Sequence, residues 1–199
     1  MSETKRITGF HRKSMYVDLG LPSGLLWATC NVGATSPEQA GLYFAWGETT
    51  GGIANMNTKL SSSLFSKITY DADGVCCPYE ILSPCCDAAH VIIGGNWRMP
   101  SEADFKELLL NTTRRWIRGS KNKSYGVEFT SKFNGGTVFF PEVGYIEGNE
   151  LLFADKMGCY WSACKNNNQA GILKIMSDNS SWGYMPRYYG LPVRAVLEF

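Results

Sequence analysis

The densest group of reactive side chains is the stretch CCPYEILSPCC, residues 76–86, which holds the thiols of Cys76, Cys77, Cys85 and Cys86. Four cysteines could bind zinc or an iron–sulfur cluster. Structural zinc sites, however, usually take ligands from C-x₂₋₄-C pairs, in which both sulfurs reach one ion. Adjacent cysteines in an extended chain point apart instead. We therefore expect thiols at or near the surface, with no metal site.

Other groups that could support catalysis are sparse. The two histidines, His11 and His90, are far apart in the sequence, and neither has a neighbouring Ser or Cys in a nucleophile arrangement. The seven cysteines are an odd number, so at least one is left outside any disulfide framework, and we expect reduced thiols. These patterns predict a protein that is not an enzyme and holds no cofactor.

A polar and aromatic segment, residues 164–190, precedes the last apolar run of the chain, LPVRAVLEF. Tyr and Trp supply contact area at low rotamer cost, and Ser, Gly and Asn supply adaptable hydrogen bonds, so recognition surfaces favour this mixture. The same small polar residues are also ordinary turn formers, which is the structural alternative. The candidate ligand contacts are Tyr160, Asn166, Asn167, Asn168, Gln169, Asp178, Asn179, Ser181, Trp182, Tyr184, Arg187, Tyr188 and Tyr189.

The elements that would position these residues are mostly short strands. One clear helix is predicted after Pro100, with Ser101 as N-cap and Asp104 at the capping-box position, ending near residues 111–113. A shorter helix is predicted in residues 86–93. Strands are predicted at residues 115–119, 125–131, 136–145, 159–164, 170–176 and 191–199, with a hairpin turn at FNGG and a second turn in YIEGNEL. Helices early and sheet late favour one α+β domain.

Composition excludes some partner classes. A net charge of +1 gives no general attraction to nucleic acid. No apolar run reaches the ~18 residues of a spanning helix, so we expect no membrane insertion. The N-terminus lacks the apolar region of a signal peptide. Residues 49–74 are polar and are predicted to form a long surface loop.

Two arginines and four tryptophans are predicted to serve the fold. Arg98 and Arg194 lie among apolar neighbours, so we expect both to brace the structure through carboxylates or carbonyls. The tryptophans in apolar surroundings are interpreted as core rather than as a binding platform; they are Trp27, Trp46, Trp97 and Trp161.

Several longer motifs together resemble a known family. The stretches YVDLGLPSGLLWATCNVGA, YFAWGET, GGNWRMPSEADFKEL, FFPEVGYIEGNEL, GCYWSA and RYYGLPVRAV are similar to the successive motifs of the Fibrobacter succinogenes major paralogous domain family, across roughly residues 16–197. The resemblance implies a C-type-lectin-like α+β fold of the branch that contains formylglycine-generating enzymes, with two or so helices flanking small antiparallel sheets and the N- and C-terminal strands paired. Family members are mostly bacterial surface proteins.

The resemblance also implies a function. Some family members are variable proteins of diversity-generating retroelements, in which mutagenesis at adenines rewrites a C-terminal region. The runner-up is a copper/thiol enzyme of the formylglycine-generating type, because Cys159 and Cys164 match the spacing of that family's copper-holding thiols. An odd separation on a strand, however, places the two side chains on opposite faces unless a bulge intervenes. The calcium-binding strings of sugar-binding lectins do not occur, so any binding is expected to be calcium-independent.

These observations lead to one prediction and two alternatives. We expect a single domain over residues 1–199, with residues 1–14 as a flexible or strand-forming extension. Its predicted role is to bind an unknown protein or glycan ligand through a variable surface, displayed on a cell or a phage. The alternatives are the copper/thiol enzyme and a structural surface or adhesin module.

Overall fold

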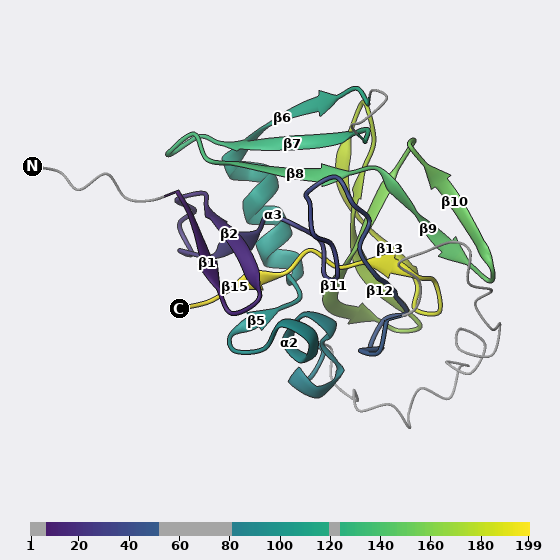
Figure 1. Cartoon of the computed structure of the whole chain (residues 1–199). Helices are drawn as coiled ribbons and strands as arrows, with labels where there is room; N and C mark the ends of the chain where they lie inside the picture. Colours follow the sequence, from purple (N-terminus) through teal and green to yellow (C-terminus); the bar gives the residue numbers. More distant parts are fainter. Residues whose placement is uncertain (1–6, 52–80, 120–123) are drawn as a thin grey trace, which may run out of the picture.

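The computed structural model describes residues 7–51, 81–119 and 124–199 (Figure 1). Within them the chain is mostly β, with about 45% of residues in strands and 12% in helices. The described helices are the 3₁₀ turn η2 (Pro84–Cys86), α2 (Ala88–Ile93) and α3 (Glu102–Asn111). None of these helices is long and apolar enough to cross a membrane. The predicted 49–74 loop falls largely outside the described residues, as do Cys76 and Cys77.

The predicted α+β, C-type-lectin-like class is wrong, because strands dominate the structure and helices are few. From Thr112 onward every regular described element is a strand. One of these strands, residues 180–186, has a polar and aromatic sequence from which no strand was predicted. The two helices that were predicted do form, but they are too short to make a layer of their own.

Four sheets carry the fold. The first has the order β1-β2-β3-β15-β5, the second β10-β9-β11-β12-β13, the third β6-β7-β8, and β14 pairs with β4. The strands of the first sheet are β1 (Thr8–His11), β2 (Ser14–Asp18), β3 (Leu26–Ala28), β15 (Val196–Leu197) and β5 (Trp97–Arg98). Those of the second are β9 (Val143–Glu147), β10 (Glu150–Ala154), β11 (Gly158–Asn166), β12 (Gln169–Ile175) and β13 (Ser180–Pro186). The others are β4 (Tyr43–Phe44), β6 (Thr112–Ile117), β7 (Gly126–Ser131), β8 (Thr137–Pro141) and β14 (Leu191–Pro192).

The two ends of the described chain meet in the first sheet. Strand β15, near the C-terminus, lies between β3 and β5 and pairs antiparallel with both. In Figure 1 the C-terminus accordingly lies beside the β1–β2 hairpin. This closure fixes the segment that leads into β15, and with it the end of the polar and aromatic stretch.

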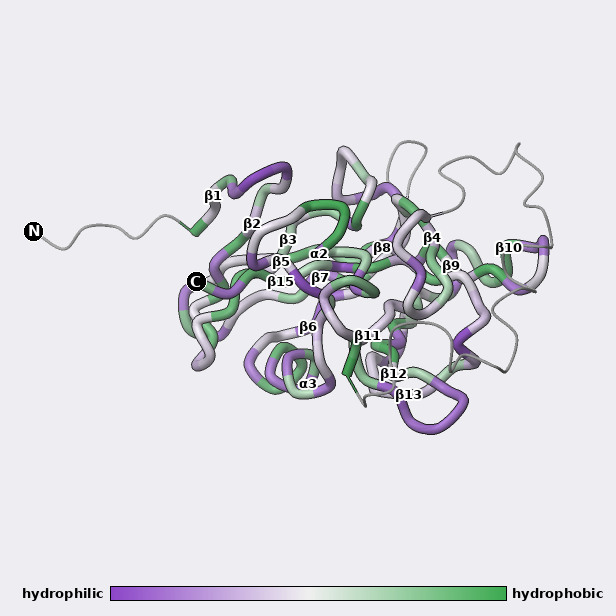
Figure 2. The backbone as a smooth tube through the Cα atoms, turned by 90° about the horizontal axis from the view of Figure 1, so that it is seen from below, coloured by the Kyte–Doolittle hydropathy of each residue, from purple (hydrophilic) through white to green (hydrophobic). Residues whose placement is uncertain are grey.

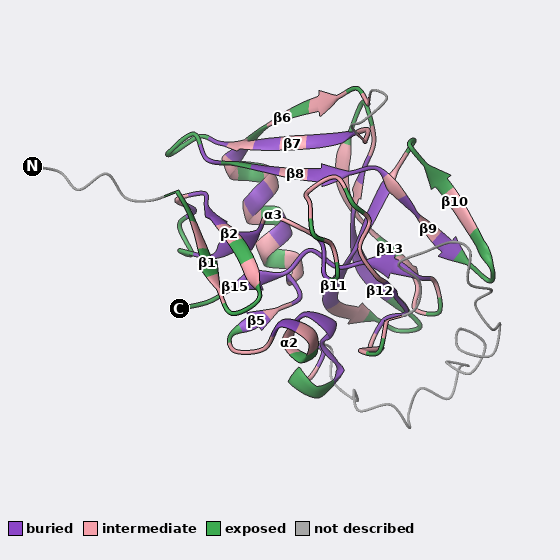
Figure 3. Cartoon of the chain, in the orientation of Figure 1, coloured by how far each residue is buried: buried purple, intermediate pink, exposed green. Residues whose placement is uncertain are grey.

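Successive residues of the central strands point into two separate cores. Trp161 of β11 packs into a first core, which also contains Trp46 and Trp97, whereas Tyr160 packs into a second core with Trp27. The four tryptophans predicted as core are confirmed, since each is at most 4% exposed. Figure 3 shows β11 and β12 largely buried, in contrast to the exposed edge strand β10. Both faces of the central strands are therefore covered.

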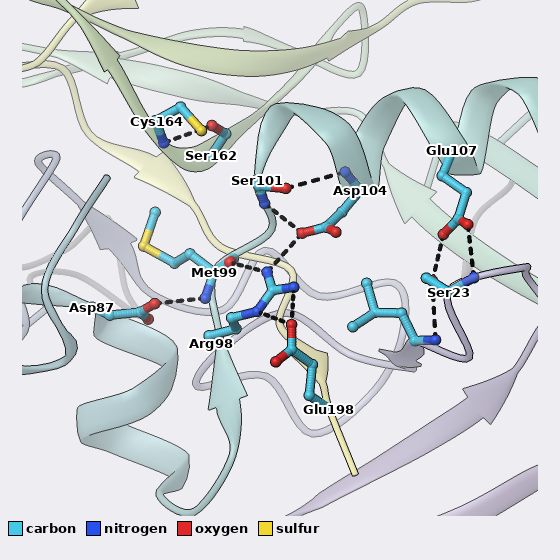
Figure 4. A network of polar contacts seen from close by, with 11 residues as sticks. Ser23, Asp87, Arg98, Met99, Ser101, Asp104, Glu107, Ser162, Cys164 and Glu198 are labelled. Atoms are coloured by element: carbon cyan, nitrogen blue, oxygen red, sulfur yellow. Dashed lines mark hydrogen bonds and ion pairs between the residues drawn. The ribbon is translucent and has the colours of Figure 1, made fainter. Parts of the chain in front are cut away.

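Arg98 braces three parts of the chain, as its apolar neighbours predict (Figure 4). Its Nη1 donates to Asp104 Oδ2 at 2.6 Å and to the Met99 carbonyl at 3.0 Å, and its Nε donates to Glu198 Oε1 at 2.8 Å. Asp104 also accepts from Ser101 N, which completes the predicted capping box at the start of α3. The arginine thus ties β5, α3 and the C-terminus together.

Candidate ligand-recognition site

The predicted contact residues are divided between the two opposite ends of the hairpins that join β11, β12 and β13 and the strands themselves. The β11–β12 turn, residues 166–169, is exposed and lies beside the end of β13, because Gln169 pairs with Pro186. The β12–β13 turn, which holds Asp178 and Asn179, lies at the other end, next to the pair Ile175–Ser180. The predicted residues therefore do not form one surface.

Tyr160 is not a ligand contact, and its assignment is corrected here. Its side chain is 0% exposed, and its hydroxyl donates to the Pro141 carbonyl at 2.5 Å. Burial raises the pKa of this phenol far above its ordinary value. Strand β11 is central in its sheet, and its residues 158–163 are buried, so this part of the strand presents no side chain to a partner.

Trp182 is half-buried and packs on the protein itself. Its ring lies over Gly171, where an added Cβ would approach Trp182 Cζ2 to 2.2 Å, and it contacts Phe105 of α3 with ring centroids 6.3 Å apart. Tyr184 lies next to it and is 40% exposed. The Trp182–Phe105 contact fastens α3 to β13, which is a structural role for Trp182. Ser181, the neighbouring candidate, is half-buried.

The β12–β13 turn is held by Arg114 of β6. The Arg114 Nε donates to Ser180 Oγ at 2.9 Å, and its Nη2 donates to the carbonyls of Met176 and Asn179. Asp178 and Asn179 are exposed, but the backbone beneath them is anchored to the third sheet. This end of the hairpins is therefore braced against the third sheet. Among the contacts of the described residues, no aromatic ring is seen to contact Asp178 or Asn179.

A row of aromatic rings starts just after the end of β13 and continues onto β9 and β10. We call it the aromatic ladder, and its members are Phe153, Tyr145, Tyr189 and Tyr188. The rings of Tyr145 and Phe153 stack with centroids 5.8 Å apart, and those of Tyr145 and Tyr189 stack at 5.3 Å with an interplanar angle of 11°. Tyr188 meets Tyr189 edge-on at 5.0 Å. Phe153 is 49% exposed and Tyr188 is 37% exposed, so both ends of the ladder face solvent.

Polar groups flank the ladder on both sides. The Tyr189 hydroxyl donates to Glu147 Oε1 at 2.8 Å. Burial, followed by the hydrogen bond and charge of Glu147, raises the pKa of Tyr189 above its ordinary value. The Arg187 guanidinium lies 5.7 Å from the ring centroid of Trp46, and the Arg187 carbonyl accepts from Trp46 N at 2.9 Å. The carboxyl group of Glu147 therefore lies against the ladder, and the Arg187 guanidinium belongs to the residue just before it.

Sequence reasoning missed Tyr145, Glu147 and Phe153. The isolated bridge between Ile146 and Gly190 brings residues 145–147 beside residues 187–189, although more than forty positions separate them in the chain. The alternation of side-chain types in the GYIEG stretch predicts a strand but does not show which distant residues the strand contacts. One local signal is the positive φ of Phe153, 58°, which is uncommon for a bulky residue and aims its ring at Tyr145.

The two thiols of the runner-up enzyme differ in environment. Cys159 is 1% exposed, and burial raises its pKa to about 12 despite the nearby Lys174. Cys164 is half-buried, beyond a register irregularity that starts at Trp161. A reactive cysteine needs a depressed pKa and partial exposure, and Cys159 has neither. The described residues also contain no group of three or more His, Cys, Asp or Glu that could hold a metal ion.

Glu142 is a buried carboxyl residue that immediately precedes β9. It is 2% exposed, and its Oε1 has no hydrogen-bond partner in the described chain. Burial raises the pKa of Glu142, although Trp116 and Arg114 oppose this effect. Because the folded state then holds its proton more tightly than the unfolded state, ionisation of Glu142 lowers stability as the pH rises above the ordinary glutamate value.

The substitution Glu142→Gln should remove that loss. We expect the variant to be more stable than the wild type at pH 7 by about 1 kcal/mol, with the difference vanishing near pH 4, where both side chains are neutral. Urea unfolding of the two proteins between these pH values measures the difference. A Gln variant that is less stable at pH 7, or a difference independent of pH, would show that the carboxylate is stabilised by a partner.

Comparisons with family models, with curated proteins and with solved structures returned no match to this chain.

Proposed function

We propose that the protein recognises a partner protein through one surface, which we call the tip surface. It consists of residues 166–169 and 187–189 together with Tyr145, Glu147 and Phe153. The observation that carries the proposal is the aromatic ladder, whose ends are 49% and 37% exposed. Aromatic residues and arginine dominate the energetics of protein interfaces, and a contiguous exposed group of them needs a functional explanation.

The arrangement of the rings favours a protein over a glycan. Sugars are bound by aromatic side chains through an open ring face, but the Tyr145 ring is covered by Phe153 on one side and Tyr189 on the other. The exposed end rings, Phe153 and Tyr188, are accompanied by phenol oxygens, the Arg187 guanidinium and the amides of residues 166–168. Such groups suit a partner that offers apolar side chains and hydrogen-bonding groups together.

The position of the three asparagines supports diversification by a retroelement, which we propose as the origin of this surface. Asn166, Asn167 and Asn168 are exposed at a hairpin turn, so replacing them leaves the cores intact. A neighbouring reverse transcriptase gene, with a near-copy of the last coding segment that differs at adenines, is the expected genomic finding. A locus without either would remove this part of the proposal and leave the recognition surface untouched.

A paired screen tests the recognition itself. Wild-type protein and the double variant Arg187→Ala/Tyr188→Ala are applied to a protein array and a glycan array, beside a matched control with Asp178→Ala/Asn179→Ala at the opposite turn. We expect at least one protein that the wild type and the control bind and that the Arg187/Tyr188 variant binds at least about tenfold more weakly. The proposal would be contradicted if the Arg187/Tyr188 variant bound the same proteins as strongly as the wild type, or if the wild type bound only glycans.

A further inference from the structure

The β1–β2 hairpin carries exposed apolar side chains away from the tip surface. Phe10 and Met15 form a cross-strand pair, and they are 67% and 52% exposed. On the opposite face Phe199 is 83% exposed and meets the rings of His11 and Tyr16 edge-on. Figure 2 shows β1 at the outer margin of the molecule, with its hydrophobic residues leading into a hydrophilic turn. Apolar side chains therefore flank both faces of this strand.

Strand β1 is also an open edge of its sheet, since β2 is its only partner among the described strands. Asp18 N donates to the Ile7 carbonyl, which makes Ile7 and Asp18 a hydrogen-bonded pair. Hydrogen-bonded and non-bonded pairs alternate in an antiparallel ladder, so Gly9 and His11 also bond to β2. The backbone groups of Thr8 and Phe10 consequently point away from the sheet and are available to another strand.

The positive charge of the hairpin indicates which kind of partner strand the edge of β1 would bind. Its turn consists of Arg12 and Lys13, both exposed, and no described carboxylate forms an ion pair with either. Basic residues at an edge repel other basic strands and attract acidic ones. A second copy of this chain presents the same positive turn and the same short strand, so charge favours a different, acidic partner.

We propose that the open edge of β1 binds an extended acidic segment of a partner protein as an added strand. The segment hydrogen-bonds to the backbone of Thr8 and Phe10, as in other cases of strand addition. Its alternate side chains pack on Phe10 and Met15 on one face and on Phe199 on the other. An acidic residue at its end pairs with Arg12 or Lys13. This edge is separate from the tip surface, so the inference does not depend on the function proposed above.

Two synthetic peptides probe the edge. One has alternating valine and threonine with aspartates at both ends, and the other has lysines in place of the aspartates. Fluorescence anisotropy with the full chain should show binding of the acidic peptide that weakens with added salt, and at least about tenfold weaker binding of the basic one. Equal binding of the two peptides, or no binding of the acidic one, would overturn the proposal.

Amide exchange gives the residue-level test. When the acidic peptide is added, the amide protons of Thr8 and Phe10 should gain protection, whereas those of Gly9 and His11, already bonded to β2, should not change. Protection elsewhere without this alternation would rule out strand addition at β1. The pattern is read from the wild-type chain, so it holds even if a variant folds poorly.

A backbone variant completes the design. Thr8→Pro removes an outward N–H, which an edge strand tolerates, and Thr8→Ala is its matched control. We expect the proline variant to bind the acidic peptide about tenfold more weakly and the alanine variant to bind as the wild type does. Sedimentation of the peptide-free protein tests the remaining possibility, which is that a second copy of the chain occupies the edge. A dimer that Thr8→Pro abolishes would assign the edge to a second copy and sink the proposal.

Discussion

Replacing Arg194 with alanine should lower the free energy of unfolding by about 3–5 kcal/mol, the largest effect of any single substitution that we expect. The side chain is 0% exposed. Its Nε donates to Asn31 Oδ1 at 2.9 Å, and its Nη1 donates to the carbonyls of Ala28 and Thr29 at 3.2 and 3.0 Å. Truncation leaves a cavity, and two buried acceptors and the half-buried Thr29 carbonyl lose this donor.

The surroundings of Arg194 explain how a buried cation is tolerated. No described carboxylate pairs with it, and burial lowers its pKa from the ordinary arginine value. The Phe140 ring lies 4.6 Å from Cζ and offers its negative face. Arg194→Met fills the volume without the charge, so we expect it to cost less than alanine, about 2 kcal/mol. Chemical unfolding of both variants measures this order, and an alanine variant within 1 kcal/mol of the wild type would contradict the bracing role.

Asp87→Ala should cost about 3 kcal/mol, because one carboxylate serves two elements. Its Oδ1 accepts from Ala89 N at 2.9 Å and His90 N at 3.1 Å at the start of α2, and its Oδ2 accepts from Met99 N at 2.8 Å just after β5. Asp87 is 4% exposed, so water cannot reach all three of the backbone N–H groups that lose their acceptor in the variant.

A second helix cap provides the matched control for Asp87. Ser101→Ala removes the cap of α3 alone and should cost only about 1 kcal/mol. Thermal unfolding of the two variants separates the cap from the link to Met99. Equal losses for Asp87→Ala and Ser101→Ala would mean that the Met99 contact contributes nothing.

Local signals predicted the local elements. Ser101 and Asp104 fixed the start of α3, and the FNGG stretch gave the turn between β7 and β8. Those features are set within a few residues of sequence. The predicted fold class was wrong because the helices are short and because β13, with the sequence SSWGYMP, shows no regular apolar alternation that would predict a strand. Its strand conformation comes from pairing with β12 and packing under α3.

The candidate site depends on contacts that no local pattern contains. Tyr160 and Tyr188 both lie in the C-terminal part of the chain, yet Tyr160 lies in the second core and Tyr188 at the surface. Strand alternation predicts on which face of a sheet a side chain lies, but not whether other elements cover that face. The ladder itself joins residues from β9, β10 and the segment after β13, and only the paired strands show that they meet.

The central claim is that the partner binds at the tip surface, and hydroxyl-radical footprinting of the protein with a bound partner tests it most directly. Tyr188 and Tyr184 are matched reporters, since they are 37% and 40% exposed and so should react alike in the free protein. We predict that the bound partner protects Tyr188 and Phe153 and leaves Tyr184 reactive. Protection of Tyr184 with Tyr188 and Phe153 unchanged would contradict the account.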